Sequence, residues 1–143
     1  MIALDTNILV YAHRKESQFH EQAKELVKNL AEGKPSWSIP WPCIYEFYSV
    51  VTNPRIWKNA ATPPKLASAQ INAWFNAPSL QLLTETQDFF ATLLPVIAQP
   101  RIRGPIVHDA RIAALCLTHG VEELVTKDRD FQLFPQLKTH DPF

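Results

Sequence analysis

Four carboxylates in this chain stand beside apolar segments, where a charged side chain is rarely placed without a partner. They are Asp5, Glu46, Asp109 and Asp128. Carboxylates packed within a few ångströms raise one another's pKa, so a cluster of them without a cation is unfavourable. A shared divalent metal ion removes that repulsion, and an oxygen-only ligand set favours Mg²⁺ or Mn²⁺ over zinc. The four acids therefore predict a metal site.

A metal site of this kind suits hydrolysis of a phosphodiester bond. The cation lowers the pKa of a bound water and stabilises the charge that develops on the phosphate, and a neighbouring carboxylate can accept the proton. We expect Asp5→Asn or Asp109→Asn to abolish cleavage. Without metal, either change should leave the fold intact or more stable, because it removes one of several crowded charges.

Two of the acids follow predicted strands and two lie in predicted helices. Asp5 ends a short buried strand over residues 1–4, and Asp128 follows the carboxyl end of a strand over residues 123–126. The helices are those over residues 44–51, with Glu46 in its first turns, and over residues 106–117, with Asp109 in its first turn. Ligands of parallel sheets bind outside the carboxyl ends of the strands, so these four segments can converge there.

The remaining pattern completes an alternation of short strands and amphipathic helices. Strands are predicted over residues 36–39, 80–83 and 137–140, and helices over residues 8–11, 19–30, 62–75 and 86–97. We expect Thr6 and Asn7 to cap the first of these helices. In the last one, Pro95 should kink or end the helix, and the expected core stripe is Phe90, Leu93, Leu94 and Ile97. The alternation favours an α/β sandwich with a mostly parallel sheet.

Length and composition favour one domain over residues 1–143. The chain is 46% hydrophobic and 20% charged, which is enough for a sizeable core. No apolar run approaches the roughly 20 residues that span a bilayer. Met1 leads directly into the first strand without a leader pattern, so we expect a cytoplasmic protein. Cys43 and Cys116 are too few for a disulfide framework and are expected as reduced core residues.

The formal net charge is zero, which gives no direct indication of a nucleic-acid partner. If four acids gather around one metal ion, the rest of the surface carries a basic excess. Six basic residues lie near segments that lead to or from the acids: Arg55, Lys58, Arg101, Arg103, Lys127 and Arg129. For any one of them, a solvated surface role is slightly favoured.

At these residues the sequence resembles the PIN-domain ribonucleases, and in particular the VapC-type toxins of bacterial and archaeal toxin–antitoxin pairs. The resemblance runs nearly from end to end. It rests on the segment Ile-Ala-Leu-Asp-Thr-Asn-Ile-Leu-Val-Tyr over residues 2–11, the Glu46 helix, the alanine-containing helix from Asp109 to Gly120, and Thr-Lys-Asp-Arg-Asp-Phe over residues 126–131. The resemblance rests on all four motifs occurring together, in this order and at this chain length.

The resemblance implies a three-layer α/β/α fold and an endoribonuclease that depends on Mg²⁺ or Mn²⁺. It also implies RNA as the substrate and inhibition by a small VapB-like antitoxin whose C-terminal tail covers the site. The implied acidic set is Asp5, Glu46, Asp109 and Asp128. Asp5 and Asp109 would bind the metal directly, Thr6 and Thr126 would support them, and Asp130 is either a fifth acid or a turn or capping residue.

Other functions fit parts of the pattern. A PIN-domain nuclease that matures ribosomal or transfer RNA would share the fold and the metal site with a toxin. A phosphotransferase of the haloacid dehalogenase type needs a second acid two residues after the first, where this chain has Asn7. A non-catalytic binding module requires that the acids fail to converge. Taken singly, each acid also has an ordinary role as a cap, a turn residue or a solvated helix residue.

Aromatic residues and one histidine near the acids have alternative roles. The stretch from Trp37 to Pro42 departs from the family pattern. Trp37, Trp41 and Trp57 could stack on bases, although contact with the core or a partner is the commoner role of tryptophan. His108, beside Asp109, is expected at the surface or in a cap rather than as a general base.

The region around the Glu46 helix also predicts a contact surface. Its exposed-looking aromatic residues are Trp41, Tyr45, Tyr48 and Trp57. Contiguous apolar patches on monomers usually mark interaction sites. We expect a homodimer, and an antitoxin that lays an apolar stretch here and directs an arginine toward the acids, because a guanidinium pairs well with carboxylates.

Overall fold

The computed structural model describes all residues from 1 to 143 and contains a five-stranded sheet in which every neighbouring pair of strands is parallel. In sheet order the strands are β3 (Leu80–Leu83), β2 (Trp37–Pro40), β1 (Ile2–Leu4), β4 (Glu123–Val125) and β5 (Thr139–His140). Their carboxyl ends share one edge of the sheet because the strands are parallel. The predicted parallel sheet is confirmed, with β5 as the edge strand expected near the C-terminus.

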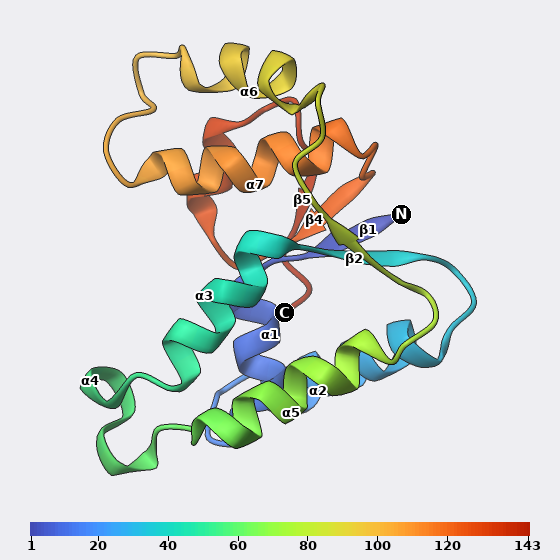
Figure 1. Cartoon of the computed structure of the whole chain (residues 1–143), viewed down its shortest axis with the longest axis vertical. Coiled ribbons are helices and arrows are strands. Elements are labelled where there is room, and N and C mark those ends of the chain that lie inside the picture. Colours follow the sequence, from blue (N-terminus) through green and yellow to red (C-terminus); the bar gives the residue numbers. More distant parts are fainter.

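Helices cover both faces of this sheet. Figure 1 shows α6 (Phe89–Ile97) and α7 (Ile106–Thr118) on one face, and α1 (Thr6–His13), α2 (His20–Glu32) and α5 (Pro64–Phe75) on the other. This is the three-layer α/β/α arrangement that the resemblance implies. Helix α3 (Trp41–Val51) leaves the carboxyl end of β2 directly and packs against α1 and α5. None of the helices is both long and apolar enough to cross a lipid bilayer.

A single cluster of 28 buried hydrophobic residues fills the space between sheet and helices. Three alanines of α7, Ala110, Ala113 and Ala114, have no exposed surface, so this helix packs closely and holds Asp109 at the edge of the core. Phe131 and Phe134 are also fully buried and fix the 3₁₀ turn Arg129–Leu133 that follows Asp128. Burial of each such ring stabilises the fold by about 1.5–3 kcal/mol.

Helix α6 differs from the prediction in the face that it buries. Phe89 and Val96 are buried, whereas Phe90 is 62% exposed and Leu94 is 49% exposed. The predicted core stripe is therefore wrong for two of its four members. The segment from Phe89 to Ile97 is apolar on nearly every side, so the spacing of its apolar residues does not predict which face is buried. Packing against α7 decides which side chains are buried.

Two helix ends also differ in detail from the expectation. The cap of α1 is Asp5, whose carboxylate accepts the backbone N–H of Thr6, rather than Thr6 or Asn7. Pro95 does not end α6, which continues to Ile97. Pro95 has no N–H to donate to the carbonyl of residue 91, so α6 continues across it with one backbone hydrogen bond fewer. One short helix, α4 (Pro54–Trp57), was not predicted, and the side chain of Asn53 caps it.

Both cysteines are free and fully buried, as predicted. Burial raises the pKa of Cys116 to about 12 and that of Cys43 well above its ordinary value. Both side chains therefore remain thiols at neutral pH.

Candidate active site

A pocket of about 320 Å³ at the carboxyl edge of the sheet is lined by all four predicted acids. Asp5 follows β1 and Asp128 follows β4, and these two strands pair directly, so both acids begin from adjacent strand ends. Glu46 comes from α3 and Asp109 from the first turn of α7. Four segments that are distant in the sequence thus meet in one place. The catalytic and metal-binding roles of these acids stay predictions.

Asp5 is held by hydrogen bonds to both of its carboxylate oxygens. Its Oδ1 accepts the backbone N–H of Thr6 at 2.7 Å and faces the thiol of Cys43 at 3.7 Å. Its Oδ2 accepts hydrogen bonds from the side-chain amide of Asn7 at 2.8 Å and from the hydroxyl of Thr126 at 2.6 Å. Burial raises the pKa of Asp5, and the hydrogen bonds from Thr126 and Thr6 oppose that rise. The fold therefore fixes this carboxylate without help from a cation.

The same network extends to Glu46 and to the strand that precedes Asp128. The hydroxyl of Thr6 donates to Oε2 of Glu46 at 2.7 Å. The hydroxyl of Thr126, which donates to Asp5, also accepts the backbone N–H of Asp128 at 2.9 Å and the amide of Asn7 at 3.1 Å. We call the group of Asp5, Thr6, Asn7, Glu46 and Thr126 the anchored half of the pocket.

Asn7 is a site residue for which the sequence suggested only a capping role. Its amide nitrogen binds Asp5 and Thr126, and its carbonyl oxygen accepts the backbone N–H of Lys127 at 3.1 Å. It therefore ties the end of β1 to the end of β4. The signal in the sequence was a polar amide two residues after an acid that ends a buried strand.

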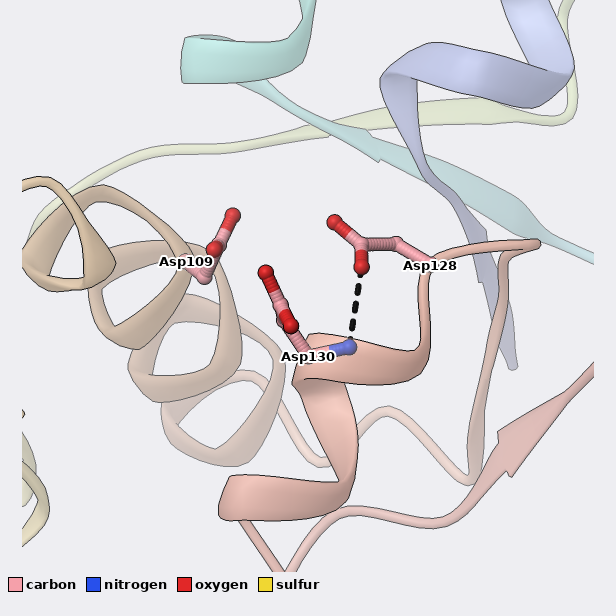
Figure 2. A group of neighbouring side chains, drawn as sticks. All are labelled: Asp109, Asp128 and Asp130. Atoms are coloured by element: carbon pink, nitrogen blue, oxygen red, sulfur yellow. Dashed lines mark hydrogen bonds between the residues drawn. The ribbon is translucent and has the colours of Figure 1, made fainter. Parts of the chain in front are cut away.

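On the other side of the site three acids lie close together: Asp109 and Asp128 line the pocket, and Asp130 lies beside them. One carboxylate oxygen from each of Asp109, Asp128 and Asp130 lies within 4.8 Å of the other two. Figure 2 shows them between the start of α7 and the turn after β4, where Oδ1 of Asp128 accepts the backbone N–H of Asp130 at 2.8 Å. The carboxylates of Asp109 and Asp130 accept no hydrogen bond from the protein. We call these three acids the open half of the pocket.

Burial, together with the nearby negative charges of Asp128, Asp5 and Glu46, raises the pKa of Asp109 to about 7. None of the five acids in the two halves forms an ion pair with a lysine, arginine or histidine. Lys127, which is next to Asp128 in sequence, pairs with Asp141 instead. The open half thus concentrates negative charge that the protein itself does not neutralise.

This donor set fits a hard divalent cation. It consists of carboxylate oxygens from three residues that already lie within a few ångströms, and it contains no thiolate or imidazole. Such oxygen ligands suit Mg²⁺ or Mn²⁺. From the sequence, Asp130 was either a fifth acid or a turn or capping residue. The structure places it in this group of acids, and the cap of the 3₁₀ turn is Asp128.

The tryptophans and His108 take mostly ordinary places. Trp37 has no exposed surface, and its indole N–H donates to Ser79 at 3.1 Å. The stretch from Trp37 to Pro42, which departs from the family pattern, therefore begins as a buried strand. Trp57 donates to the backbone oxygen of Val50 at 2.8 Å and lies under the guanidinium of Arg14. His108 is exposed at the start of α7 and its side chain forms no hydrogen bond, as expected for a surface residue.

Together, the fold and the pocket define a class of protein: an α/β/α domain with a cluster of acids at the carboxyl edge of a parallel sheet. The family model described as the PIN domain matches residues 2–136. The chain belongs to the PIN domain family.

Two relatives from Mycobacterium tuberculosis match nearly the whole chain. Ribonuclease VapC48 is 31% identical over 139 residues, which are 97% of this chain and 95% of the relative. Ribonuclease VapC43 is 28% identical over 142 residues, which are 99% of this chain and 95% of the relative. The ribonuclease names of these relatives are consistent with the acidic pocket.

Solved structures share the fold at lower sequence identity. The crystal structure of VapBC2 from Rickettsia felis, bound to a DNA fragment from its promoter, matches with a TM-score of 0.67 and 20% identity over 98% of both chains. Mycobacterium tuberculosis VapC20, described as a toxin that cleaves the sarcin–ricin loop, matches with a TM-score of 0.66 and 17% identity over 92% of this chain and 93% of that one. At these identities the likeness shows the fold.

Proposed function

We propose that residues 1–143 form one nuclease domain, an endoribonuclease that hydrolyses RNA phosphodiester bonds with Mg²⁺ or Mn²⁺ as its cation. The observation that carries this proposal is the pocket lined by four acids, with Asp130 beside two of them, and none of the five is paired with a basic side chain. A divalent cation would neutralise such a cluster. The ribonuclease names of the relatives support RNA as the substrate.

Each half of the pocket has its own role in this proposal. Asp109, Asp128 and Asp130 would hold the cation, together with Oδ1 of Asp5, which also accepts a hydrogen bond from the backbone N–H of Thr6 and faces the thiol of Cys43. When bound, the cation supplies a lower pKa for the attacking water and charge stabilisation at the phosphate.

In this proposal Glu46 takes up the proton of the attacking water. Thr6 occupies its Oε2, which orients the carboxylate and leaves Oε1 free as a base. The water oxygen forms a bond to phosphorus while the bond from phosphorus to a ribose oxygen breaks. The departing ribose oxygen takes a proton from solvent.

The biological role that we propose is that of the toxin in a type II toxin–antitoxin pair, acting in the cytoplasm, where its RNA substrate lies. A VapB-like antitoxin would direct an arginine into the acidic pocket and compete with the cation. Tyr48 (37% exposed) and Ile56 (52% exposed), on and beside α3, offer apolar surface to that partner or to a second copy in a homodimer. Maturation of ribosomal or transfer RNA is the alternative role. A short neighbouring reading frame for a DNA-binding partner favours the toxin, and its absence favours maturation.

Cleavage of single-stranded RNA by the purified protein tests the proposed chemistry. Cleavage should require Mg²⁺ or Mn²⁺ and should stop in a chelator, because the water and the phosphate both depend on the cation. Restoring an excess of Mn²⁺ should restore activity and exclude irreversible unfolding. Undiminished cleavage in a chelator would refute the metal-dependent mechanism.

A further inference from the structure

We infer that a second pocket beside the acidic one binds a single unstacked base of the substrate RNA near the cleaved bond. The inference rests on the proposed ribonuclease function and names how its substrate is positioned. The pocket has a volume of about 330 Å³, and the lining residues that matter are Trp41, Tyr45, Glu85 and Arg111. That volume is at the lower end of the roughly 300–1,000 Å³ of small-ligand sites, as suits one base rather than a larger group.

The position of this pocket links it to the acids. Trp41 begins α3 directly after β2, and Glu85 follows β3, so the pocket lies at the carboxyl ends of β2 and β3. The acidic pocket lies at the carboxyl ends of β1 and β4, and β1 pairs with β2. Neighbouring strands are about 4.8 Å apart, so the two pockets are separated by roughly 10 Å along one edge.

The two pockets also share their walls. Helix α3 carries Tyr45 in the second pocket and Glu46 in the acidic pocket, and α7 carries Arg111 and Asp109 in the same relation. An RNA strand with its phosphate beside the acids therefore passes the second pocket without leaving the protein surface. A base that occupies this pocket would fix the register of the strand relative to the acids.

Aromatic rings form a stacking surface in the second pocket. The ring of Tyr45 is stacked on that of Trp41, with 6.0 Å between centroids and 29° between planes. Trp41 in turn meets Phe75 of α5 edge-on, with centroids 5.5 Å apart, and this contact holds Trp41 in place. Tyr45 is nevertheless 66% exposed. An exposed ring that is held rigid from behind is what a base can stack on, because every base presents a flat aromatic face.

Polar groups beside these rings can bind the edge of a base. Nε of Arg111 donates to Oε1 of Glu85 at 2.5 Å, which orients the guanidinium. The two terminal nitrogens of Arg111 and the second carboxylate oxygen of Glu85 have no hydrogen-bond partner in the protein. Donors and an acceptor next to a stacking ring are the groups that proteins use to recognise unstacked RNA bases. The same unpaired polar groups disfavour an apolar side chain of a protein partner as the occupant.

Scanning an RNA with abasic nucleotides tests the inference on the full-length protein. The substrate is the single-stranded RNA that the parent cleaves best from a random pool, and each position near the cleaved bond is made abasic in turn. With the parent protein, the abasic change at one of these positions should lower kcat/KM by about 10-fold, as expected for the loss of one base–aromatic stack. Tyr45→Ala should lower kcat/KM of the intact RNA by a similar factor and should be insensitive to the abasic change at that position.

Two further variants separate recognition from folding. Phe90→Ala removes an aromatic side chain of similar exposure, 62%, outside both pockets, and should keep the abasic sensitivity of the parent. Arg111→Gln should alter the preference among the four bases at the sensitive position. A merely structural role of Tyr45 or Arg111 would change the rate on all substrates equally and leave both patterns intact.

A binding measurement keeps the inference testable if no cleavage is found. The affinity of a fluorescently labelled random-sequence RNA is then measured in a chelator, with and without abasic nucleotides. Abasic sensitivity that depends on Tyr45 would support the pocket even if the ribonuclease proposal fails. Equal abasic profiles for the parent and Tyr45→Ala, in cleavage or in binding, would overturn the pocket and leave the ribonuclease proposal standing. So would a Tyr45→Ala variant that changes only inhibition by a protein partner, since the pocket would then be a protein-binding surface.

Discussion

The two halves of the acidic pocket carry the same kind of side chain but are stabilised in opposite ways. In the anchored half, Asp5 accepts hydrogen bonds at both oxygens, and Glu46 is held by Thr6. In the open half, Asp109 and Asp130 accept no hydrogen bond and lie close to Asp128. The folded chain therefore provides partners for one half and leaves the other half to be completed by a cation.

This difference shows how one site can be both stable and reactive. A buried carboxylate with several donors is tolerated, and its position is fixed before any ligand binds. Neighbouring carboxylates without donors destabilise the fold, and that repulsion becomes affinity for a cation when one is available. Substitution of an acid by its amide should consequently have opposite effects on metal-free stability in the two halves.

The largest expected effect is the loss of activity when the open half loses an acid. Asp109→Asn should lower kcat for RNA cleavage by at least about 10³-fold, because cation stabilisation of the transition state contributes several kcal/mol. Steady-state cleavage at saturating Mn²⁺ measures this. Asp88→Asn changes an exposed acid outside the pocket and should retain the activity of the parent. Comparable activity of Asp109→Asn and Asp88→Asn would exclude Asp109 from the cation site.

A second prediction concerns the stability of the anchored half. Asp5→Asn places an amide nitrogen where donors from Thr6, Asn7 and Thr126 converge, so at least one buried donor loses its acceptor. The free energy of unfolding of the metal-free protein should fall by about 2 kcal/mol, the cost of a buried unsatisfied group. Urea unfolding in a chelator measures it. If Asp5→Asn is as stable as the parent or more stable, charge repulsion among the acids would outweigh the hydrogen bonds to Asp5.

Much of the fold could be predicted because its elements are local patterns. The strands that end at Asp5 and before Asp128 are short apolar runs, and α7 has a regular apolar stripe closed by Gly120, which adopts a positive φ of 66°. The buried face of α6 was not predictable in this way, because its apolar residues surround the helix and only the contact with α7 selects among them. The four residues of α4 are too few to form a periodic pattern.

Some features of the site could also be predicted from the sequence, and others could not. The sequence identified its acids because a parallel sheet brings strand ends to one edge. It did not separate the acids into two halves, because that depends on which side chains meet in the folded chain, including residues more than 100 positions apart such as Asn7 and Thr126. For the same reason it did not distinguish Asp5 from Asp109 in their effect on stability.

A smaller effect is the dependence of metal-free stability on pH. The pKa of Asp109 lies at about 7 in the folded protein and at 3.8 in its ordinary state, so between these values the folded protein retains a proton that the unfolded chain has released. Stability should therefore fall as pH rises from about 4 to about 7. Asp109→Asn should reduce this fall, and subtracting its profile from that of the parent removes the contribution of titrating groups that lie away from Asp109. Parallel profiles of the two proteins would argue against a raised pKa at Asp109.

The most direct test of the difference between the halves is the thermal unfolding of Asp109→Asn at pH 7.5, with and without Mn²⁺. In a chelator the variant should unfold at a higher temperature than the parent, by a few degrees, because removal of one repulsive charge contributes about 1 kcal/mol. Addition of Mn²⁺ should raise the unfolding temperature of the parent and of Asp88→Asn, but have little effect on Asp109→Asn. A metal-free variant that unfolds below the parent, or that gains as much stability from Mn²⁺ as the parent does, would contradict the assignment of the cation to the open half.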